Sequence, residues 1–190
     1  MPPTFSQTEQ MTQWLLQDDI RKQALETVAR LNLPQCYLAA GFLRNLVWDQ
    51  LHSREESTPL NDVDVVYFAP EETEERYLEY ERILKETIPY LNWQVRNQAY
   101  MHVRNGDQPY SNTIDAMGYW PEKETAVGVR LASDDSFEFT SAFGFESLFN
   151  LHITHNPKRC QTVFEQRVAS KHWLKNWSKL SVIQKQKGRD

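Results

Sequence analysis

Two aspartates separated by one residue are the side chains of this sequence best placed to do chemistry. Asp62 and Asp64 lie in the stretch 61–68, where Val63, Val65 and the residues after them predict a β-strand. Side chains two residues apart on a strand point to the same face, about 7 Å apart along the backbone. Neighbouring carboxylates that are partly buried repel each other unless a cation lies between them. Oxygen ligands favour Mg²⁺ or Mn²⁺, so the pair predicts a divalent-metal site; the alternative is a strand end whose aspartates face water.

A second candidate feature is a glycine between a predicted strand and a predicted helix. The apolar run 36–40 is interrupted by Gly41, and helical spacing resumes over residues 42–51. Glycine lets the backbone come close to a phosphate, and the free amides of the first helical turn point toward the anion. Arg44 lies on that turn and could bind phosphate oxygens. The alternatives are a tight packing turn at Gly41 and, for Arg44, a surface ion pair with Asp49 or a loop glutamate.

The elements that must position these residues alternate between helix and strand. Helical spacing covers 7–32 in two pieces, 71–88, 145–153 and 158–177. Residues 93–103 predict a strand, or a strand with a kink, and 125–131 and 137–140 predict a hairpin. The sequence contains no internal repeat and no low-complexity linker. We therefore expect one domain over residues 1–190, with an α/β core at about 34–140 and flanking helices at 7–32 and 145–177.

The composition is that of a soluble globular protein. The chain has 190 residues, a net charge of −5 and a mean hydropathy of −0.67. The negative charge argues against bulk attraction to nucleic acid, and no apolar run is long enough to span a membrane. The start, Met1–Thr4, lacks the basic and apolar regions of a secretory signal, so we expect a cytoplasmic protein. Cys36 and Cys160 are too few for a disulfide scaffold, and we expect both to be reduced, buried thiols.

The order of strand, glycine, helix, loop and Asp-x-Asp strand resembles the nucleotidyltransferase superfamily that includes DNA polymerase β and the CCA-adding enzymes. More closely, residues 36–180 resemble a small bacterial nucleotidyltransferase-like family long carried as a domain of unknown function. The matching stretches are Ala40–Asp49, Asn61–Phe68, Asn97–His102, Asp115–Ala116, Glu122, Thr125–Arg130, and Lys171 with Trp173, Leu174 and Trp177.

This resemblance implies a fold, an activity and a set of site residues. The fold would be a minimal polymerase-β-like palm, a mixed α/β sheet with N- and C-terminal flanking helices. The enzyme would move a nucleoside monophosphate from an NTP to a hydroxyl or phosphate acceptor and release pyrophosphate. Asp62 and Asp64 would bind one or two Mg²⁺ or Mn²⁺ ions, while Gly41 and Arg44 would bind the triphosphate. The acceptor could be a small molecule, a protein or RNA.

The superfamily normally has a third carboxylate on a neighbouring strand that helps deprotonate the attacking hydroxyl, and here this sequence departs from the pattern. Gln94 occupies the centre of the next predicted strand, and an amide cannot act as a base. Asp115 and Glu122 are the nearest replacements in sequence. Asp115 is favoured because its sequence neighbours are apolar; either residue could instead be a helix cap or a surface charge.

Two further departures concern the phosphate turn and the loop that follows. The superfamily usually has Gly-Ser where this chain has Gly41 and Phe42, so a hydroxyl that could bind phosphate is missing. The segment between Gly41 and Asp62 is also long, with 53–59 as an inserted loop. Both departures make a divergent substrate, or a loss of activity, more credible.

Further polar residues are weaker candidates for nucleotide binding. Asn97, Gln98 and His102 follow Gln94 in the sequence, and Arg130 ends the first strand of the predicted hairpin. Asn97 could contact a base or sugar edge, and His102 could contact phosphate or carry a proton. Arg130 could bind a phosphate or an anionic group of the acceptor. A lone histidine on a strand is more often structural.

The sequence supports three hypotheses from different classes. The first is the metal-dependent nucleotidyltransferase. The second is a catalytically silent nucleotide-binding or regulatory module on the same fold, favoured by Gln94 and Phe42. The third is an Mg²⁺ phosphohydrolase with an aspartyl nucleophile, which normally follows an early N-terminal strand rather than a glycine–arginine helix turn.

Overall fold

The computed structural model describes residues 5–184; Met1–Thr4, the basis for expecting no secretory signal, lies outside this part of the chain. The helices are α1 (Gln7–Leu16), α2 (Asp19–Ala29), α3 (Gly41–Leu51), α4 (Tyr77–Thr87), α5 (Gln98–Asn105), α6 (Thr113–Met117), α7 (Glu146–Phe149), α8 (Gln161–Lys171) and α9 (Trp173–Asn176). The strands are β1 (Tyr37–Ala39), β2 (Asp62–Tyr67), β3 (Asn92–Asn97), β4 (Val127–Leu131), β5 (Phe137–Ser141), β6 (His152–Thr154) and β7 (Ser181–Ile183).

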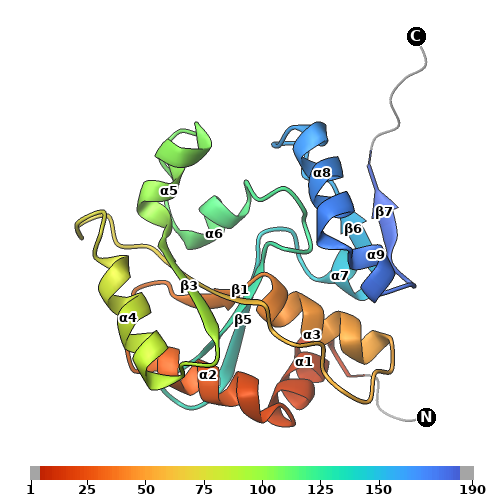
Figure 1. Ribbon diagram of the computed structural model, residues 1–190, viewed down its shortest axis with the longest axis horizontal. Coiled ribbons are helices and arrows are strands. Elements are labelled where there is room, and N and C mark those ends of the chain that lie inside the picture. Colours follow the sequence, from red (N-terminus) through yellow and green to blue (C-terminus); the bar gives the residue numbers. More distant parts are fainter. Residues whose placement is uncertain (1–4, 185–190) are drawn as a thin grey trace.

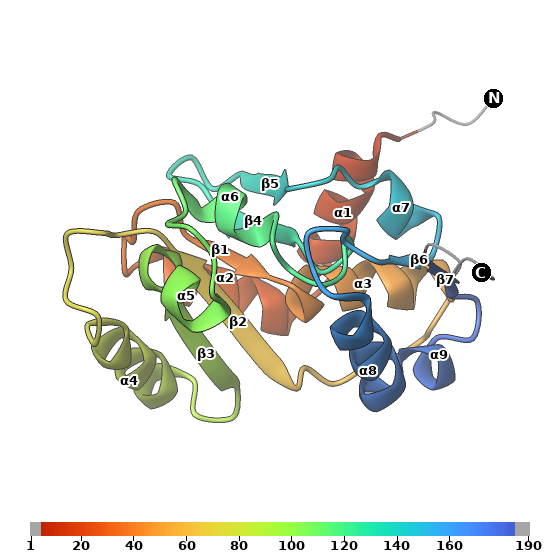
Figure 2. The same cartoon turned by 90° about the horizontal axis from the view of Figure 1, so that it is seen from above.

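The main sheet is mixed, as predicted, with the strand order β3-β2-β1-β4-β5. β2 and β3 run parallel, and α4 supplies the crossover that a parallel pair requires. β1 pairs antiparallel with both β2 and β4, and β4 and β5 form the predicted hairpin. Figure 1 shows α1, α2 and α3 along one side of this sheet, with α5 and α6 on the other. Figure 2 shows α8 and α9 beside each other, far from α4.

Alternation along most of β2 and β3 separates a core face from a face that carries the aspartates. Val63, Val65, Trp93 and Val95 are fully buried in the core, which they share with residues of α2, α3 and α4. Burial of each such side chain stabilises the fold by about 1.5–3 kcal/mol. A slip of one residue would turn every side chain of a strand to the other face. The apolar set therefore fixes the register of β2 and sends its aspartates to the opposite face.

The strand predicted over 93–103 is wrong in its second half. β3 ends at Asn97, whose side chain accepts a hydrogen bond from the Ala99 backbone N–H at 3.1 Å and caps α5. Gly106, with φ of 72°, ends that helix in the left-handed conformation. The apolar residues of α5 alternate in the sequence as they would in a half-buried strand. They lie on a helix instead, where the Val103 side chain is 72% exposed.

The C-terminal helices are also shorter than predicted. Only α7 forms within 145–153, because Leu151 adopts a φ of 58° and the chain then enters β6, which pairs with β7. The predicted helix 158–177 is divided into α8 and α9 at His172, where φ is 56°. The helix expected from residue 71 begins at Tyr77.

The two cysteines differ in their surroundings. Both are free thiols, and Cys36 is buried as expected, with burial raising its pKa to about 12. Cys160 is exposed, so the prediction of a buried thiol there is wrong. It lies at the N-terminal cap of α8, where hydrogen bonding to the Thr162 backbone N–H lowers the pKa of the thiol.

None of the helices within residues 5–184 has the length and apolar character needed to cross a membrane.

Asp49 is a buried carboxylate near the end of α3 that joins three segments. Its oxygens accept hydrogen bonds from the Thr58 N–H at 2.6 Å, the Thr58 hydroxyl at 2.7 Å and the Trp177 indole N–H at 2.8 Å. The Arg54 guanidinium lies 3.6 Å away. These contacts hold the inserted loop and the end of α9 against α3. Asp49 therefore binds its own loop and not Arg44.

We expect Asp49→Ala to lower the free energy of unfolding by about 3 kcal/mol, because it leaves buried donors and a cation without their partner. Urea denaturation followed by tryptophan fluorescence measures the change. Asp19→Ala is the matched control, since the Asp19 side chain is 95% exposed, and it should change stability by less than about 0.5 kcal/mol. Equal losses in the two variants would contradict the structural role of Asp49.

Candidate active site

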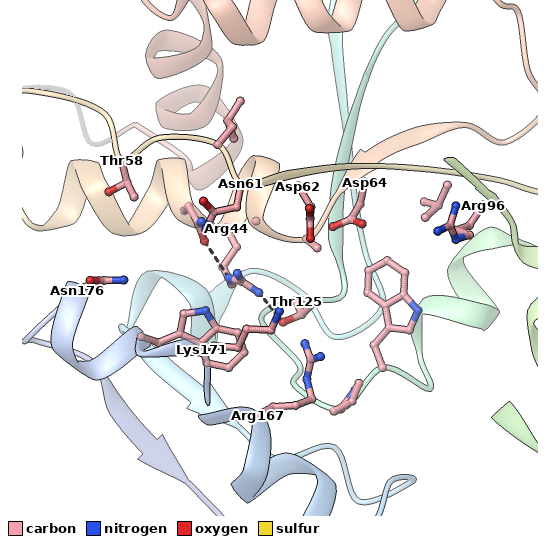
Figure 3. A pocket seen from close by; sticks show the side chains of 18 of the residues that line it. Arg44, Thr58, Asn61, Asp62, Asp64, Arg96, Thr125, Arg167, Lys171 and Asn176 are labelled. Carbon is pink, nitrogen blue, oxygen red and sulfur yellow. Dashed lines mark hydrogen bonds between the residues drawn. The ribbon is translucent and has the colours of Figure 1, made fainter. Parts of the chain in front are cut away.

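A cavity of about 430 Å³ lies on the polar side of β2, between the sheet and helices α8 and α9 (Figure 3). It collects side chains from the start of α3, the inserted loop, two neighbouring strands and α8. Four of the predicted site residues meet there, namely Gly41, Arg44, Asp62 and Asp64. Residues far apart in the sequence complete its walls.

The two aspartates differ in what they contact. Asp62 is exposed, and its Oδ1 accepts a hydrogen bond from Asn92 Nδ2 at 2.5 Å. Asp64 is half-buried, and within residues 5–184 no hydrogen bond or ion pair reaches its carboxylate. Burial, followed by repulsion from Asp62, raises the pKa of Asp64 to about 6, although Arg44 and Arg96 oppose the shift. The cavity therefore holds a carboxylate whose charge the protein does not satisfy.

These carboxylates fit a divalent cation. Both carboxylates point from one face of β2 into the cavity, and a cation bound there would give Asp64 the direct partner that it lacks. In the described part of the chain, no group of three or more His, Cys, Asp or Glu side chains is arranged to hold a metal. A pair of carboxylates still suits Mg²⁺, which keeps several waters and takes further oxygens from substrate phosphates.

The turn between β1 and α3 forms a small cradle of N–H donors. Ala40 has φ of 55°, a strained value for a residue with a side chain, and it turns the chain sharply into the helix. A Cβ atom placed on Gly41 would lie 3.2 Å from Asn45 Nδ2 and 3.3 Å from Arg44 Nη2. The bare Cα of Gly41 therefore leaves room beside two donor groups, an arrangement that favours an anion.

Arg44 is held rigidly at this cradle. Its guanidinium lies 4.9 Å from the Trp48 ring centroid and 4.8 Å from that of Trp173, so two indoles enclose it. Nε donates to Asn45 Oδ1 at 3.1 Å, and Nη1 donates to the Thr125 hydroxyl at 2.8 Å. Burial lowers the pKa of Arg44 to about 10, which leaves it cationic at neutral pH. Within residues 5–184 it makes no salt bridge, so the surface ion pair considered as an alternative does not form.

Glu122 supports the wall of the cavity and does not line it. It is 1% exposed and accepts hydrogen bonds from the Thr125 hydroxyl at 2.9 Å and from Arg167 Nε at 2.5 Å. Through these contacts it links Arg44, by way of Thr125, to Arg167 on α8. Its carboxylate is engaged with these partners, so it positions them.

Asp115 is not brought to the aspartate pair. It lies in the first turn of α6, where its carboxylate accepts a hydrogen bond from the Ser111 backbone N–H at 2.9 Å. It lines a separate hollow with Tyr37 and Lys158. This contact corresponds to the helix cap that the sequence left open as the alternative role of Asp115. The apolar neighbours of Asp115 in the sequence did not indicate its position in the fold.

Three further predicted nucleotide-binding residues also lie outside the cavity. Asn97 is buried, where its side chain donates to the Ala69 carbonyl at 2.8 Å and accepts from the Ala69 N–H at 3.0 Å. His102 lies on α5, not on a strand. Arg130 pairs across the hairpin with Glu138. Gln98, from the same polar group of residues, does line the cavity.

Sequence reasoning assigned no role to the opposite wall, although Lys171 is among the residues that match the family. Arg167 and Lys171 lie one turn apart on α8 and face the aspartates across the cavity (Figure 3). Their spacing of four on a predicted helix was an available signal for a shared face. Arg96, two residues after Gln94 on β3, was likewise predictable as a neighbour on the same face. Thr58 and Asn176 reach the cavity only through long-range packing and carried no local signal.

The raised pKa of Asp64 predicts a pH-dependent cost in the metal-free protein. Below about pH 4 the carboxyl group is protonated in both the folded and unfolded states, and the cost is absent. Between pH 4 and 6 only the unfolded state ionises readily, so stability falls as pH rises, and the full cost is present above pH 6.

We therefore expect Asp64→Asn to raise the free energy of unfolding in EDTA at pH 7.5 by about 1–3 kcal/mol. The gain should fall to about 0.5 kcal/mol at pH 4, close to the unfolded-state pKa, and urea denaturation at both pH values tests it. Asp19→Asn, at an exposed position, should give no comparable gain. A gain that is the same at both pH values would show that ionisation is not its cause.

Known proteins share this sequence pattern and fold. A family model described as "Nucleotidyltransferase" matches residues 26–182. A solved structure described as "The NMR structure of the protein reveals a CCA-adding enzyme head domain" is 28% identical, with a TM-score of 0.84, and the match covers 96% of this chain and 98% of that one. No curated protein matches the sequence. Both matches confirm the resemblance seen in the motifs, and because the family model spans most of the chain, the protein belongs to this nucleotidyltransferase family.

Proposed function

We propose that the protein is a metal-dependent nucleotidyltransferase that moves a nucleoside monophosphate from an NTP to an acceptor and releases pyrophosphate. One observation carries this proposal: a pair of carboxylates, one without a protein partner, shares a cavity with a donor cradle at Gly41 and several cations. Membership of the family supports transfer chemistry. The metal, the NTP and the acceptor are what the proposal adds.

Asp62 and Asp64 would hold one or two Mg²⁺ or Mn²⁺ ions. Bound there, the metal would neutralise phosphate charge and polarise the phosphoryl group that is transferred. Asp64 is the more important ligand of the two, because no side chain in the described residues contacts its carboxylate directly, although Arg44, Arg96 and Lys171 stabilise its charge from a distance. Asp62, already bonded to Asn92, keeps a second oxygen for the site.

The cationic residues would bind the phosphates from two walls. Arg44 Nη2 and Asn45 Nδ2 lie beside Gly41. Within residues 5–184 neither group donates a hydrogen bond to the protein, so both are available to a phosphate. Arg167 and Lys171 approach from α8. Lys171 has no salt-bridge partner in the described chain, so its charge is available to the departing pyrophosphate. Preorganised cations of this kind stabilise charge that develops in the transition state.

A catalytically silent nucleotide-binding module is the second candidate, and one observation favours it. Gln94 pairs in register with Asp64 on the neighbouring parallel strand, so both side chains lie on the same face. An amide therefore stands where the superfamily has its third carboxylate. Such a module would bind NTP without turnover.

We expect Asp62→Asn and Asp64→Asn each to lower the rate of pyrophosphate release by about 10³-fold, because the bound metal supplies several kcal/mol of charge stabilisation and each 1.36 kcal/mol is tenfold in rate. A coupled pyrophosphate assay with a panel of NTPs, with and without Mg²⁺, measures the rate. Asp19→Asn should keep the wild-type rate. Magnesium-dependent NTP binding by calorimetry without any pyrophosphate release would favour the silent module, and the absence of both would overturn both candidates.

Lys171→Met should weaken NTP binding about tenfold, because one charge-assisted contact with phosphate is worth about 1.4 kcal/mol or more. Lys175→Met is the matched control, since Lys175 is exposed close by and lines a different hollow. Calorimetric titration with NTP should show less than a twofold change for this control. Equal losses of NTP affinity in the two variants would mean that Lys171 contributes only long-range electrostatic attraction and no direct contact with phosphate.

A further inference from the structure

We infer that the acceptor is a small molecule whose attacking oxygen is already ionised at neutral pH, a phosphate or a carboxylate, and that Arg96 binds it. This inference deepens the proposed function and rests on it. Three observations carry it: the order of the strands, the group that stands beside Asp64, and the contacts of Arg96.

The order of the strands distinguishes two ends of the cavity, one beside β1 and the other beside β3. β2 lies between β1, which leads into Gly41, and β3, which carries Arg96. Figure 3 shows the same order, with Arg44 and Lys171 on one side of the aspartates and Arg96 on the other. In-line displacement places the attacking oxygen opposite the leaving pyrophosphate. If pyrophosphate leaves toward Arg44 and Lys171, the acceptor enters from the side of Arg96.

At the acceptor end, an amide stands where a base is expected, and a cation lies next to that amide. Gln94 lies beside Asp64, and its Oε1 accepts a hydrogen bond from Arg96 Nη2 at 3.0 Å. Arg96 Nη1 donates to the Val95 carbonyl at 2.6 Å and contacts Glu81 at 3.2 Å. This network fixes the guanidinium at the rim of the cavity. A guanidinium attracts an anion and cannot accept a proton.

The carboxylates near the acceptor end are already engaged. In the described part of the chain, Asp62 and Asp64 are the acidic residues that line the cavity, and both are assigned to the metal. Glu81 binds Lys85, Arg96 and the Val95 backbone N–H at the outer edge of β3. A hydroxyl acceptor would need one of them as a base. An ionised oxygen needs none.

The reaction balances without proton transfer. A lone pair of the ionised acceptor oxygen forms a bond to the α-phosphorus of the NTP. The bond from that phosphorus to the oxygen bridging to the β-phosphate breaks, and its electron pair leaves with pyrophosphate. A phosphate acceptor gives a phosphoanhydride, and a carboxylate acceptor gives an acyl phosphate anhydride. A hydroxyl acceptor would give a phosphodiester and would have to lose a proton.

The wild-type chain with Mg²⁺ and NTP can be tested against three arms of acceptors. Glucose 1-phosphate and glycerol 3-phosphate form the phosphate arm, acetate and alanine the carboxylate arm, and glycerol and an oligoribonucleotide with a free 3′-hydroxyl the third arm. Pyrophosphate release gives the rate, and ³¹P NMR with mass spectrometry identifies the bond formed. We expect at least a tenfold preference for one ionised arm, with an anhydride product. Preference for the hydroxyl arm overturns the inference alone, whereas no release and no NTP binding in any arm overturns the proposed function as well.

Variants at the acceptor end provide a second test. Arg96→Gln should lower kcat/KM for the ionised acceptor at least tenfold while the Kd for NTP changes less than twofold, and Arg96→Lys should restore part of the loss. Gln94→Glu should lower transfer to the ionised acceptor and raise transfer to glycerol. Arg82→Gln is the control, because Arg82 pairs with Glu86 on the exposed side of α4. A loss in Arg96→Gln that is the same for ionised and hydroxyl acceptors, or an unchanged acceptor preference in Gln94→Glu, would overturn the inference.

Discussion

The structure depends on one constraint, which is that β2 must turn Val63 and Val65 to the core and Asp62 and Asp64 to the cavity. Val63 and Val65 are fully buried, so the register of β2 between its neighbours cannot change without bringing Asp62 and Asp64 into the core. That register in turn places the α3 turn on one side of the aspartates and Gln94 on the other. Core packing thus determines the geometry of the site.

Electrostatics then determine what the cavity can accept. Two like charges on adjacent positions of one strand face are unfavourable, and the folded chain leaves Asp64 without a direct partner in the described residues. The compensating cations do not touch it. Arg44 is fixed between two indoles, and Glu122 holds Arg167 on the opposite wall. The charges are therefore held apart across an open space, an arrangement that favours a ligand carrying both a cation and several negative oxygens.

Local patterns in the sequence predicted the part of the candidate site that is built from local structure. The period of β2 revealed Asp62 and Asp64, and the glycine before α3 revealed Gly41 and Arg44. The wall from α8 lies about a hundred residues further along the chain, and only tertiary packing brings it near. Asp115 lines a different hollow for a related reason, because apolar neighbours in sequence do not determine where a turn lies in the fold. The mixed sheet was predictable, but α5 was not, because its apolar residues alternate while Asn97 and Gly106 supply the caps of a helix.

The contrast between the whole chain and its cavity bears on the size of the partner. The chain carries a net charge of −5, which argues against bulk electrostatic attraction to a large polyanion such as RNA. The cavity is different, since arginines and a lysine surround the two aspartates that line it among the described residues. Such a separation of charge admits small anions to the cavity and disfavours extended ones at the surface. The negative net charge of the chain and the cations that line its cavity therefore support the proposal that both ligands are small anions, an NTP and an ionised acceptor.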